Sequence, residues 1–360
     1  MNLRPLLLLS VLAAPPARAQ VDATTMRAHF IDVGQGAATL LEFSCGVVLI
    51  DTGGEDAAAV DHLVTYLQGV FAARPELHDT VDAVYISHNH VDHTRGLRRV
   101  VEQFHVRRVI ENHKRGGPSD QGDATLRWLD GNAAAHGVQH LDVDDDEVVQ
   151  SQVGLSGPDL DPLACGGPSV NDPEIRILAA DRADRPTDWN TDDFGDKNNH
   201  SVVVRVDFGR ASFLFSGDME TRALGALVDR YAGTALLDVD VWQVGHHGSD
   251  NGTTTGFLDA VARPAVAVIA MGRCDVHGMW TAWGHGHPRK SAVDRLRSAI
   301  LRRRSQSRRV QVADGQHSFT ATLLRDALYG TGWDGTIVVR ATAEGTYRVT
   351  TERSSAPQTC

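Results

Sequence analysis

The chain has 360 residues, of which 42% are hydrophobic and 22% are charged, with 34 glycines and 13 prolines. This composition suits one large or two small globular domains and excludes a disordered protein, a coiled coil and a collagen-like rod. The net charge of −11 argues against a general polyanion binder, so a nucleic acid would need a local basic patch. The 17 histidines are a surplus of the commonest metal ligand.

Residues 1–19 have the pattern of a secretory signal peptide. Arg4 supplies a positive charge, residues 6–14 form an apolar stretch, and Ala17-Arg18-Ala19 is a small-x-small cleavage site. The apolar stretch is shorter than the about 20 residues that a membrane-spanning helix needs, which weighs against an N-terminal anchor. We therefore expect an exported protein, periplasmic or extracellular, whose mature chain 20–360 is one soluble domain without a membrane anchor.

In the first half of the chain, strands alternate with helices. Apolar runs predict strands at 27–33, 39–43, 47–51, 83–87 and 106–110, and apolar residues at helical spacing predict helices at 57–71, 97–104 and 124–135. The following segment, 142–197, is acidic and rich in Pro and Gly, so we expect a loop there. Its run 142–147 is most simply a solvated charge cluster.

The second half repeats this plan. The predicted strands are 201–208, 212–216, 239–244 and 265–271, and the predicted helices are 220–231, 256–262 and a basic one at 289–304. A β-hairpin near 335–350 follows, with strands at 336–341 and 346–350. Two halves of this kind predict an α/β (α+β) fold, an αββα sandwich of two mixed β-sheets flanked by helices.

The strongest chemical signal directly follows the predicted strand 83–87. His88, His90, Asp92 and His93 are four potential ligands within one short loop. Odd spacing in a non-helical loop lets His88 and His90 face one point while Asp92 and His93 face another, as a centre of two metal ions needs. Imidazole and carboxylate without thiolate favour zinc, with manganese or iron as alternatives.

Other polar groups also follow predicted strands, where a rigid scaffold positions them. Asp218 ends one strand and is suited to bridging two metals, and His246 and His247 end another. Asp51 is a candidate for a carboxylate that holds a ligand in place. Each motif alone is also typical of a turn, but together they predict a metal site.

In this order the motifs resemble the metallo-β-lactamase-fold hydrolases, and within them the hydrolase domain of the competence protein ComEC and its secreted stand-alone relatives. The likeness spans Met26 to Thr350 and is carried, besides the loop 88–93, by Asp32-Val33-Gly34-Gln35-Gly36, Asp51-Thr52-Gly53, Asn198-Asn199-His200-Ser201, Gly217-Asp218, His246-His247-Gly248-Ser249, Gly286-His287-Pro288 and Trp333-Asp334-Gly335. It implies the metallo-β-lactamase fold and metal-dependent hydrolysis.

The resemblance also implies roles for single residues. His88 and His90 would bind the first metal, Asp92, His93 and one of His246 and His247 the second, and Asp218 would bridge them. Many members of the superfamily add a histidine to the first metal, and here the matching position offers Asn198 or His200, with His113 as an outside candidate. The metals would lower the pKa of a shared water and make it a nucleophile.

Around this centre, Asp92 and His287 are the catalytic candidates, His287 as a substrate contact or proton donor, and Ser249 is a substrate-binding candidate. The segment 274–283 looks like an insertion that brings His277 and His285 near the entrance, where we expect ordinary surface histidines. Four cysteines, Cys45, Cys165, Cys274 and Cys360, allow two disulfides in three pairings, with free buried thiols as the alternative.

The favoured function is a secreted phosphodiesterase or nuclease-like enzyme that uses two divalent metals. A local basic stretch supports a phosphodiester or nucleic-acid substrate, although a solvated helix end explains it equally simply; it comprises Arg295, Arg297, Arg302, Arg303, Arg304, Arg308 and Arg309. One alternative is a hydrolase of a carbon ester or amide, such as a lactone or a β-lactam. Another is a binding module on a hydrolase fold that has lost its activity.

Overall fold

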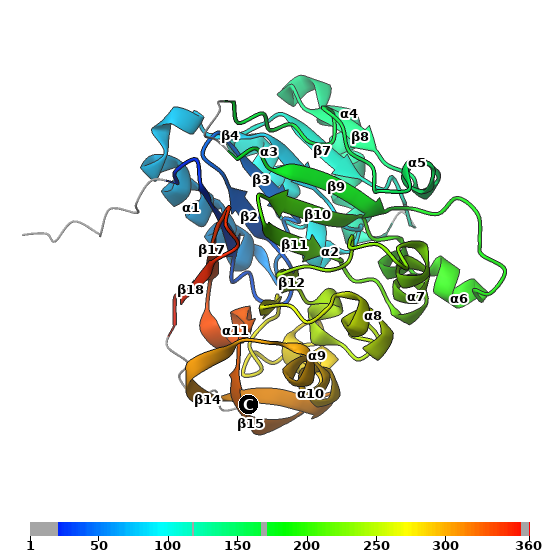
Figure 1. The fold of residues 1–360 in the computed structure, drawn as a ribbon. Coiled ribbons are helices and arrows are strands. Elements are labelled where there is room, and N and C mark those ends of the chain that lie inside the picture. Colours follow the sequence, from blue (N-terminus) through cyan, green and yellow to red (C-terminus); the bar gives the residue numbers. More distant parts are fainter. Residues whose placement is uncertain (1–20, 117–118, 167–170, 354–359) are drawn as a thin grey trace, which may run out of the picture.

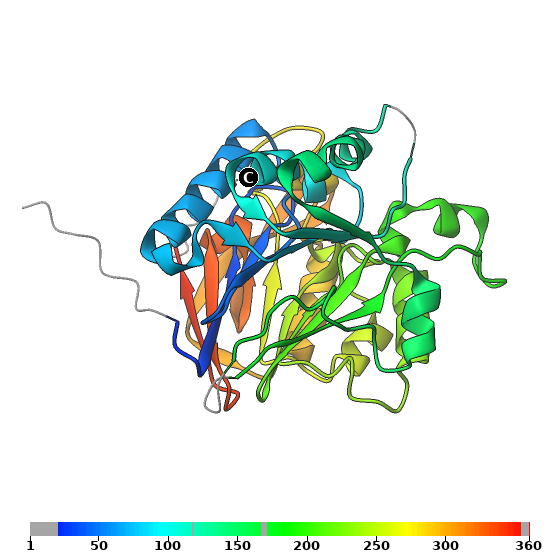
Figure 2. The same ribbon diagram turned by 90° about the horizontal axis from the view of Figure 1, so that it is seen from above.

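The computed structural model describes residues 21–116, 119–166, 171–353 and 360. The predicted signal peptide and its cleavage site lie outside these residues. Two β-sheets pack face to face with helices on their outer sides (Figures 1 and 2), which confirms the αββα sandwich. Within the described chain, no helix combines the length and the apolar character that a bilayer crossing requires.

The first sheet contains the first and the last strands of the chain, β1 and β18. Its strand order is β18-β17-β1-β2-β3-β5-β7-β8. The strands are β1 (Thr25–Phe30), β2 (Thr39–Glu42), β3 (Val47–Ile50), β5 (Ala83–Tyr85), β7 (Arg108–Glu111), β8 (Gln139–Asp142), β17 (Ile337–Thr342) and β18 (Tyr347–Thr351). Since β17 pairs antiparallel with both β1 and β18, the predicted C-terminal hairpin is confirmed and becomes part of this sheet.

The second sheet comes from the middle of the chain and has the order β16-β13-β12-β11-β10-β9. Its strands are β9 (Glu174–Ala179), β10 (Val203–Phe208), β11 (Ala211–Phe215), β12 (Val241–Gln243), β13 (Val266–Ile269) and β16 (Leu328–Gly330). Phe30 of the first sheet stacks on Phe215 of the second, with ring centroids 6.3 Å apart. Contacts of this kind form the apolar layer between the sheets.

The helices cover the outer faces. Those packed on the first sheet are α1 (Ala57–Ala73), α3 (Leu97–Gln103) and α4 (Gln121–Asn132). Those packed on the second are α5 (Asp145–Ser151), α7 (Thr221–Arg230), α8 (Thr255–Ala260) and α10 (Lys290–Ala299). Short helices lie in the connections: α2 (Val91–Thr94), α6 (Thr191–Gly195), α9 (Ala282–His285) and α11 (Thr331–Asp334).

The acidic segment 142–197 is not the loop that we expected, because it contains α5, β9 and α6. Within its charged run, Asp144 caps α5 by accepting the Glu147 backbone N–H at 2.9 Å. Asp145 is buried and accepts a hydrogen bond from Arg230 at 2.8 Å. The run 142–147 is therefore partly structural rather than only a solvated cluster.

The predicted basic helix 289–304 is also corrected. The helix α10 ends at Ala299, and the chain then forms a two-stranded ribbon of β14 (Arg303–Gly315) and β15 (Ser318–Asp326). Buried Arg308, Val310 and Val312 alternate with less buried neighbours, which is the period of a strand. A small parallel pair, β4 (Thr80–Val81) and β6 (His105–Val106), completes the strands.

Two disulfides join Cys45 to Cys165 and Cys274 to Cys360. The first links the β2–β3 turn to the segment before β9, and so connects the two sheets. The second ties the segment after β13 to the C-terminal residue. The alternative of free thiols is therefore wrong.

Candidate metal centre

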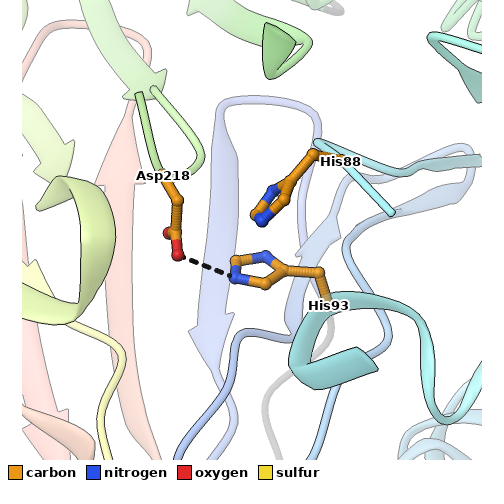
Figure 3. A group of neighbouring side chains, drawn as sticks. All are labelled: His88, His93 and Asp218. Atoms are coloured by element: carbon orange, nitrogen blue, oxygen red, sulfur yellow. Dashed lines mark ion pairs between the residues drawn. The ribbon is translucent and has the colours of Figure 1, made fainter. Parts of the chain in front are cut away.

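The predicted ligands meet at one rim of the sandwich, where strands of both sheets end. His88, His90, Asp92 and His93 follow β5 of the first sheet, while Asp218 follows β11 of the second. Figure 3 shows the rings of His88 and His93 on one side and the Asp218 carboxylate facing them across the gap between the sheets. The ligand atoms of these three buried residues all lie within 4.8 Å of one another.

One half of the site is formed by His88 and His90. Nε2 of His88 lies 3.0 Å from Nδ1 of His90, and Oγ of Ser87 lies 3.1 Å from Nδ1 of His88. The two facing imidazole nitrogens are the pair that the resemblance assigns to the first metal.

The other half identifies which of the two consecutive histidines points inward. Nε2 of His247 lies 3.2 Å from carboxylate oxygens of both Asp92 and Asp218, and 3.3 Å from Nε2 of His93. Nε2 of His246 is 4.0 Å from Asp218, and its Nδ1 is 3.5 Å from Glu220. His247 is therefore the better-placed ligand, and Asp218 contacts His93 and His247 while a carboxylate oxygen lies within 4.8 Å of a His88 ring nitrogen.

Local backbone conformation makes this arrangement possible. His246 and His247 both adopt left-handed backbone angles, with φ of 48° and 51°. Such angles are costly for non-glycine residues and cluster at functional sites. At Gly53, a side chain would overlap the backbone of Asp92, so only glycine lets the Asp51-Thr52-Gly53 turn pack against the ligand loop.

Two hydrogen bonds orient the rings of His93 and His247. The Nδ1–H of His93 donates to the Asp51 carboxylate at 2.8 Å, and Asp51 also accepts the backbone N–H of Ser87 at 2.7 Å. The Nδ1–H of His247 donates to the Ala270 carbonyl at 2.7 Å. Each bond leaves Nε2 facing the site. The structure thus places Asp51 in its expected supporting position.

The buried carboxylates of the site attract positive charge, which neighbouring histidines supply in the metal-free chain. Burial opposes the charged form of Asp218, but His247 and His93 outweigh it and hold the pKa of this carboxyl well below its usual range. Burial likewise opposes protonation of His247, yet Asp218 and Asp92 raise its pKa to about 10. Burial and the neighbouring His93 and His90 hold the pKa of His88 well below its usual value, so its nitrogens are available as ligands.

The donor set fits divalent metals. Ligand atoms around one tetrahedral zinc, each about 2.0–2.1 Å from the ion, lie roughly 3.3–3.4 Å apart. The nitrogen and oxygen atoms of His93, His247, Asp92 and Asp218 are 3.2–3.3 Å from their neighbours. We call these four residues, with His88 and His90, the ligand cluster. Imidazoles and carboxylates are typical ligands of zinc, manganese and iron.

The three candidates for a third ligand of the first metal differ in position and in hydrogen bonding. His200 is buried, with Nε2 2.7 Å from the Phe194 carbonyl and Nδ1 in contact with Asp181, so both nitrogens are occupied and its prediction as a ligand is wrong. His113 lies elsewhere, 2.9 Å from Asp142. Asn198 instead lines the cavity at the site, and its buried Oδ1 has no hydrogen-bond partner within the described chain. Asn198 therefore stays the candidate.

A cavity of about 650 Å³ opens over the ligand cluster. Beyond the ligands, it is lined by Gln35, Gly54, Glu55, Val91, Arg95, Ser119, Asp120, Gln121, Asn198, His246, Trp280, His285 and His287. The sequence analysis had not assigned Gln35, Glu55, Arg95 or Trp280 a role. Gln35 could have been found from the sequence, because it belongs to the Asp32–Gly36 motif. Glu55, Arg95 and Trp280 lie in none of the motifs that carry the family resemblance.

His287 lines the cavity beside the ligand cluster. Its Nδ1 is 3.4 Å from the Gln35 amide nitrogen, which leaves Nε2 to face a substrate. Burial and the nearby His247 and His246 hold the pKa of His287 well below its ordinary value. The ring stacks on that of His285, with centroids 5.6 Å apart. His285 therefore belongs to the cavity wall rather than to the ordinary surface, whereas His277 is exposed and stacks on Trp283.

Ser249 does not line the cavity. Its hydroxyl contacts Asn251 and accepts the Gly252 backbone N–H at 3.1 Å, so it holds a local turn. The prediction of Ser249 as a substrate-binding residue is therefore wrong, because its hydrogen bonds are used within its own loop.

The arginine-rich stretch is largely paired. Arg295 lies 2.9 Å from Asp250, Arg297 lies 3.4 Å from Asp326, and Arg303 also contacts Asp326. Arg308 is buried against Asp334. None of these four side chains lines the cavity. A negatively charged substrate at the ligand cluster must therefore be neutralised by cationic groups other than these four arginines.

Comparisons with known proteins identify the family of the chain. The family model described as the metallo-beta-lactamase superfamily matches residues 31–273. Recombination protein 2 of Haemophilus influenzae is 38% identical over 28% of this chain and 11% of its own length, and competence protein ComA of Neisseria gonorrhoeae is 31% identical over 37% of this chain and 19% of its own length. The matched region is thus a small part of each relative.

Among solved structures, the metallo-beta-lactamase fold protein YhfI from Bacillus subtilis is 11% identical, with a TM-score of 0.35 over 69% of this chain and 71% of that one. The family model covers more than half of the chain and includes His88, His90, Asp92, His93, Asp218 and His247. The chain belongs to the metallo-beta-lactamase superfamily, and its relatives include competence proteins.

Proposed function

We propose that this protein is an exported phosphodiesterase that acts with two divalent metals, zinc favoured. The observation that carries the proposal is the ligand cluster, whose nitrogen and carboxylate atoms converge at metal-like separations on the floor of a cavity. When bound there, divalent metals would supply Lewis acidity that polarises a phosphoryl oxygen and makes water nucleophilic near neutral pH. His88 and His90 would hold one ion, Asp92, His93 and His247 the other, and Asp218 would contact both.

The residues around the cluster support a phosphodiester. Arg95 places a guanidinium in the cavity wall, held by a hydrogen bond to the Gly54 carbonyl at 2.8 Å. His287, with Nδ1 near Gln35, would donate a hydrogen bond from Nε2–H to a phosphodiester oxygen. Relatives named for recombination and competence make nucleic-acid phosphodiesters the first substrates to test.

Export is part of the same proposal. The two disulfides fit an oxidising compartment, since structural disulfides are rare in reducing ones. N-terminal sequencing of material secreted by the native host should give a start at or near Gln20. An intact Met1 in a cytoplasmic fraction would contradict export.

The reaction class is tested on chain 20–360, loaded with zinc or manganese. Four substrates are compared: bis-p-nitrophenyl phosphate, single-stranded DNA, a lactone and nitrocefin. We expect kcat/KM to be highest for a phosphodiester and the activity to disappear on chelation. Faster turnover of the lactone or nitrocefin would favour a carbon ester or amide hydrolase, and absence of bound metal would favour a binding module.

A further inference from the structure

Trp280 is a large aromatic side chain that is 70% exposed although it lines the cavity over the ligand cluster. All six tryptophans lie in the described residues, and the other five are buried or half-buried. We propose that Trp280 is a platform on which a nucleobase of the substrate stacks while the adjacent phosphodiester lies at the ligand cluster. This inference rests on the proposed function and names its substrate class, a nucleotide-type phosphodiester.

The loop that carries Trp280 is held in place from several sides. The Cys274–Cys360 disulfide ties down its start. Thr281 caps α9 by accepting the Gly284 N–H at 3.2 Å and donates its hydroxyl hydrogen to the Gly278 carbonyl at 2.9 Å. At Gly284 there is no room for a side chain against the backbone of residues 278 and 279. Such a loop presents Trp280 with little ordering cost on binding.

A row of rings leads from Trp280 to the ligand cluster. The ring centroids of Trp280 and His285 are 5.9 Å apart, those of His285 and His287 are 5.6 Å apart, and those of His287 and His247 are 6.2 Å apart. The planes of His285 and His287 differ by 21°. An aromatic wall therefore begins at the mouth of the cavity and ends at a metal ligand.

The other cavity-lining residues indicate whether the substrate group on Trp280 is a flat heterocycle or an aliphatic chain. Among the cavity-lining residues Val91 is the one aliphatic side chain, while Gln35, Ser119, Gln121 and Asn198 offer amides and a hydroxyl. An alkyl chain would leave those polar groups unpartnered, whereas a nucleobase has an apolar face for Trp280 and polar edges for the other walls.

The size and charge of the cavity narrow the substrate further. A volume of about 650 Å³ lies within the range of single-ligand pockets, about 300–1,000 Å³, so it holds one or two nucleotide units. Besides the ligands, Glu55 and Asp120 line it, and Arg95 is the one arginine or lysine that does. A long polyanion gains little from such walls, so a short or single-stranded substrate is favoured.

The test compares two single-stranded oligomers of equal length, one of thymidylate and one of abasic sugars. Stacking on an aromatic side chain is sequence-tolerant, and its loss corresponds to about a 5- to 150-fold weakening per base. Trp280→Ala should therefore raise KM for the thymidylate oligomer about tenfold or more and leave KM for the abasic oligomer nearly unchanged. Trp280→Phe should keep KM for the thymidylate oligomer close to the wild-type value.

Met279 provides the matched control, since it is 74% exposed on the same loop but does not line the cavity. Met279→Ala should leave both KM values unchanged, and all three variants should keep the wild-type metal content. Equal effects of Trp280→Ala on the two oligomers would overturn the inference. So would equal effects of Trp280→Ala and Met279→Ala, which would mark the loop as a docking face for a protein or membrane.

A second readout does not depend on turnover. Thymidine monophosphate should quench the tryptophan fluorescence of the wild-type chain, and Trp280→Phe should lose that part of the quenching. If the wild-type chain cleaves neither oligomer but shows this quenching, the proposed function fails while the stacking site stands. Quenching that is the same in both proteins would overturn the stacking site itself.

Discussion

Two groups of histidines and carboxylates lie at strand ends of the sandwich, and their difference is instructive. One is the ligand cluster, which combines the loop after β5 of the first sheet with residues that follow β11 and β12 of the second. The other, here called the Glu111 cluster, lies at the ends of β7 and β8 and comprises Glu111, His113, Asp130, His140 and Asp142. In both, sets of three potential ligands lie within 4.8 Å of one another, so residue type and proximity do not separate them.

The two clusters differ in whether an arginine side chain neutralises their carboxylates. Arg115 contacts both carboxylate oxygens of Glu111, at 2.5 and 2.9 Å, and reaches Asp130 at 3.2 Å. Burial opposes the charge on Glu111, but Arg115 and His140 outweigh it and lower its pKa to about 2. In the ligand cluster, Asp92 and Asp218 have only histidines as ion-pair partners among the described residues. A guanidinium makes the Glu111 cluster an ion-pair network, and the absence of one leaves the ligand cluster open to metals.

The largest effect should come from Asp218→Ala, because this carboxylate contacts His93 and His247 and lies within 4.8 Å of His88. We expect loss of bound metal and a fall in kcat/KM of more than about 100-fold, beyond what removal of a supporting carboxylate costs. Elemental analysis and kinetics check this. Asp142→Ala in the Glu111 cluster is the matched control and should change neither. Two metals retained by the Asp218 variant would contradict the assignment of Asp218 as a metal ligand.

The next comparison is between neighbouring residues. His247→Ala should reduce metal content and activity strongly, because Nε2 of His247 lies within 3.3 Å of three other ligand atoms. His246→Ala should keep the metal content, because its Nε2 is 4.0 Å from the nearest carboxylate. Metal titration of both variants decides between them, and the opposite order would show that His246 is the ligand.

Asp51→Asn should have a smaller effect on the same site. The variant keeps the shape of the side chain but weakens the hydrogen bond that orients His93. We expect metal affinity to fall about 10- to 100-fold, as for other supporting carboxylates. Competition with a chelator measures the affinity, and an unchanged value would assign Asp51 to the folding of the turn alone.

His287→Ala should separate chemistry from metal binding. Because His287 lines the cavity but lies outside the ligand cluster, kcat should fall about 100-fold, as for loss of a hydrogen-bond donor to the developing negative charge, while metal content stays at the wild-type value. Rates and elemental analysis on the same preparation test this. A variant that loses metal would place His287 among the ligands instead.

The smallest effect on activity should come from Glu111→Gln, whose consequence is stability. Since the pKa of Glu111 is lowered from 4.5 to about 2, its ion pairs stabilise the fold above pH 4.5, and this stabilisation is lost as the pH falls toward 2. The shift corresponds to about 3 kcal/mol. Urea unfolding of the metal-free proteins should show the wild-type chain more stable at pH 7 and the difference shrinking below pH 4.5. A pH-independent difference would show that Glu111 titrates normally.

The sequence by itself was enough for most strands, the main helices and the loop 88–93, because these depend on local patterns. Apolar runs of four residues define β3 and β13, and four ligands within one loop need no distant partner to be recognised. The Asp51 and Asp218 roles followed because both residues stand at the ends of such runs. The fold class could be predicted for the same reason.

Only the tertiary structure decided the rest, because it depends on contacts between distant segments. His247 rather than His246 faces the site since two left-handed residues turn the chain there, and His200 is excluded since Phe194 and Asp181 occupy its nitrogens. The polar ribbon β14–β15 carries too weak an apolar pattern to be distinguished from a basic helix end. The position of Trp280 in the cavity wall could not be predicted from the sequence, because its neighbours in the chain include none of the ligand cluster. The Cys274 disulfide and α9 hold it there.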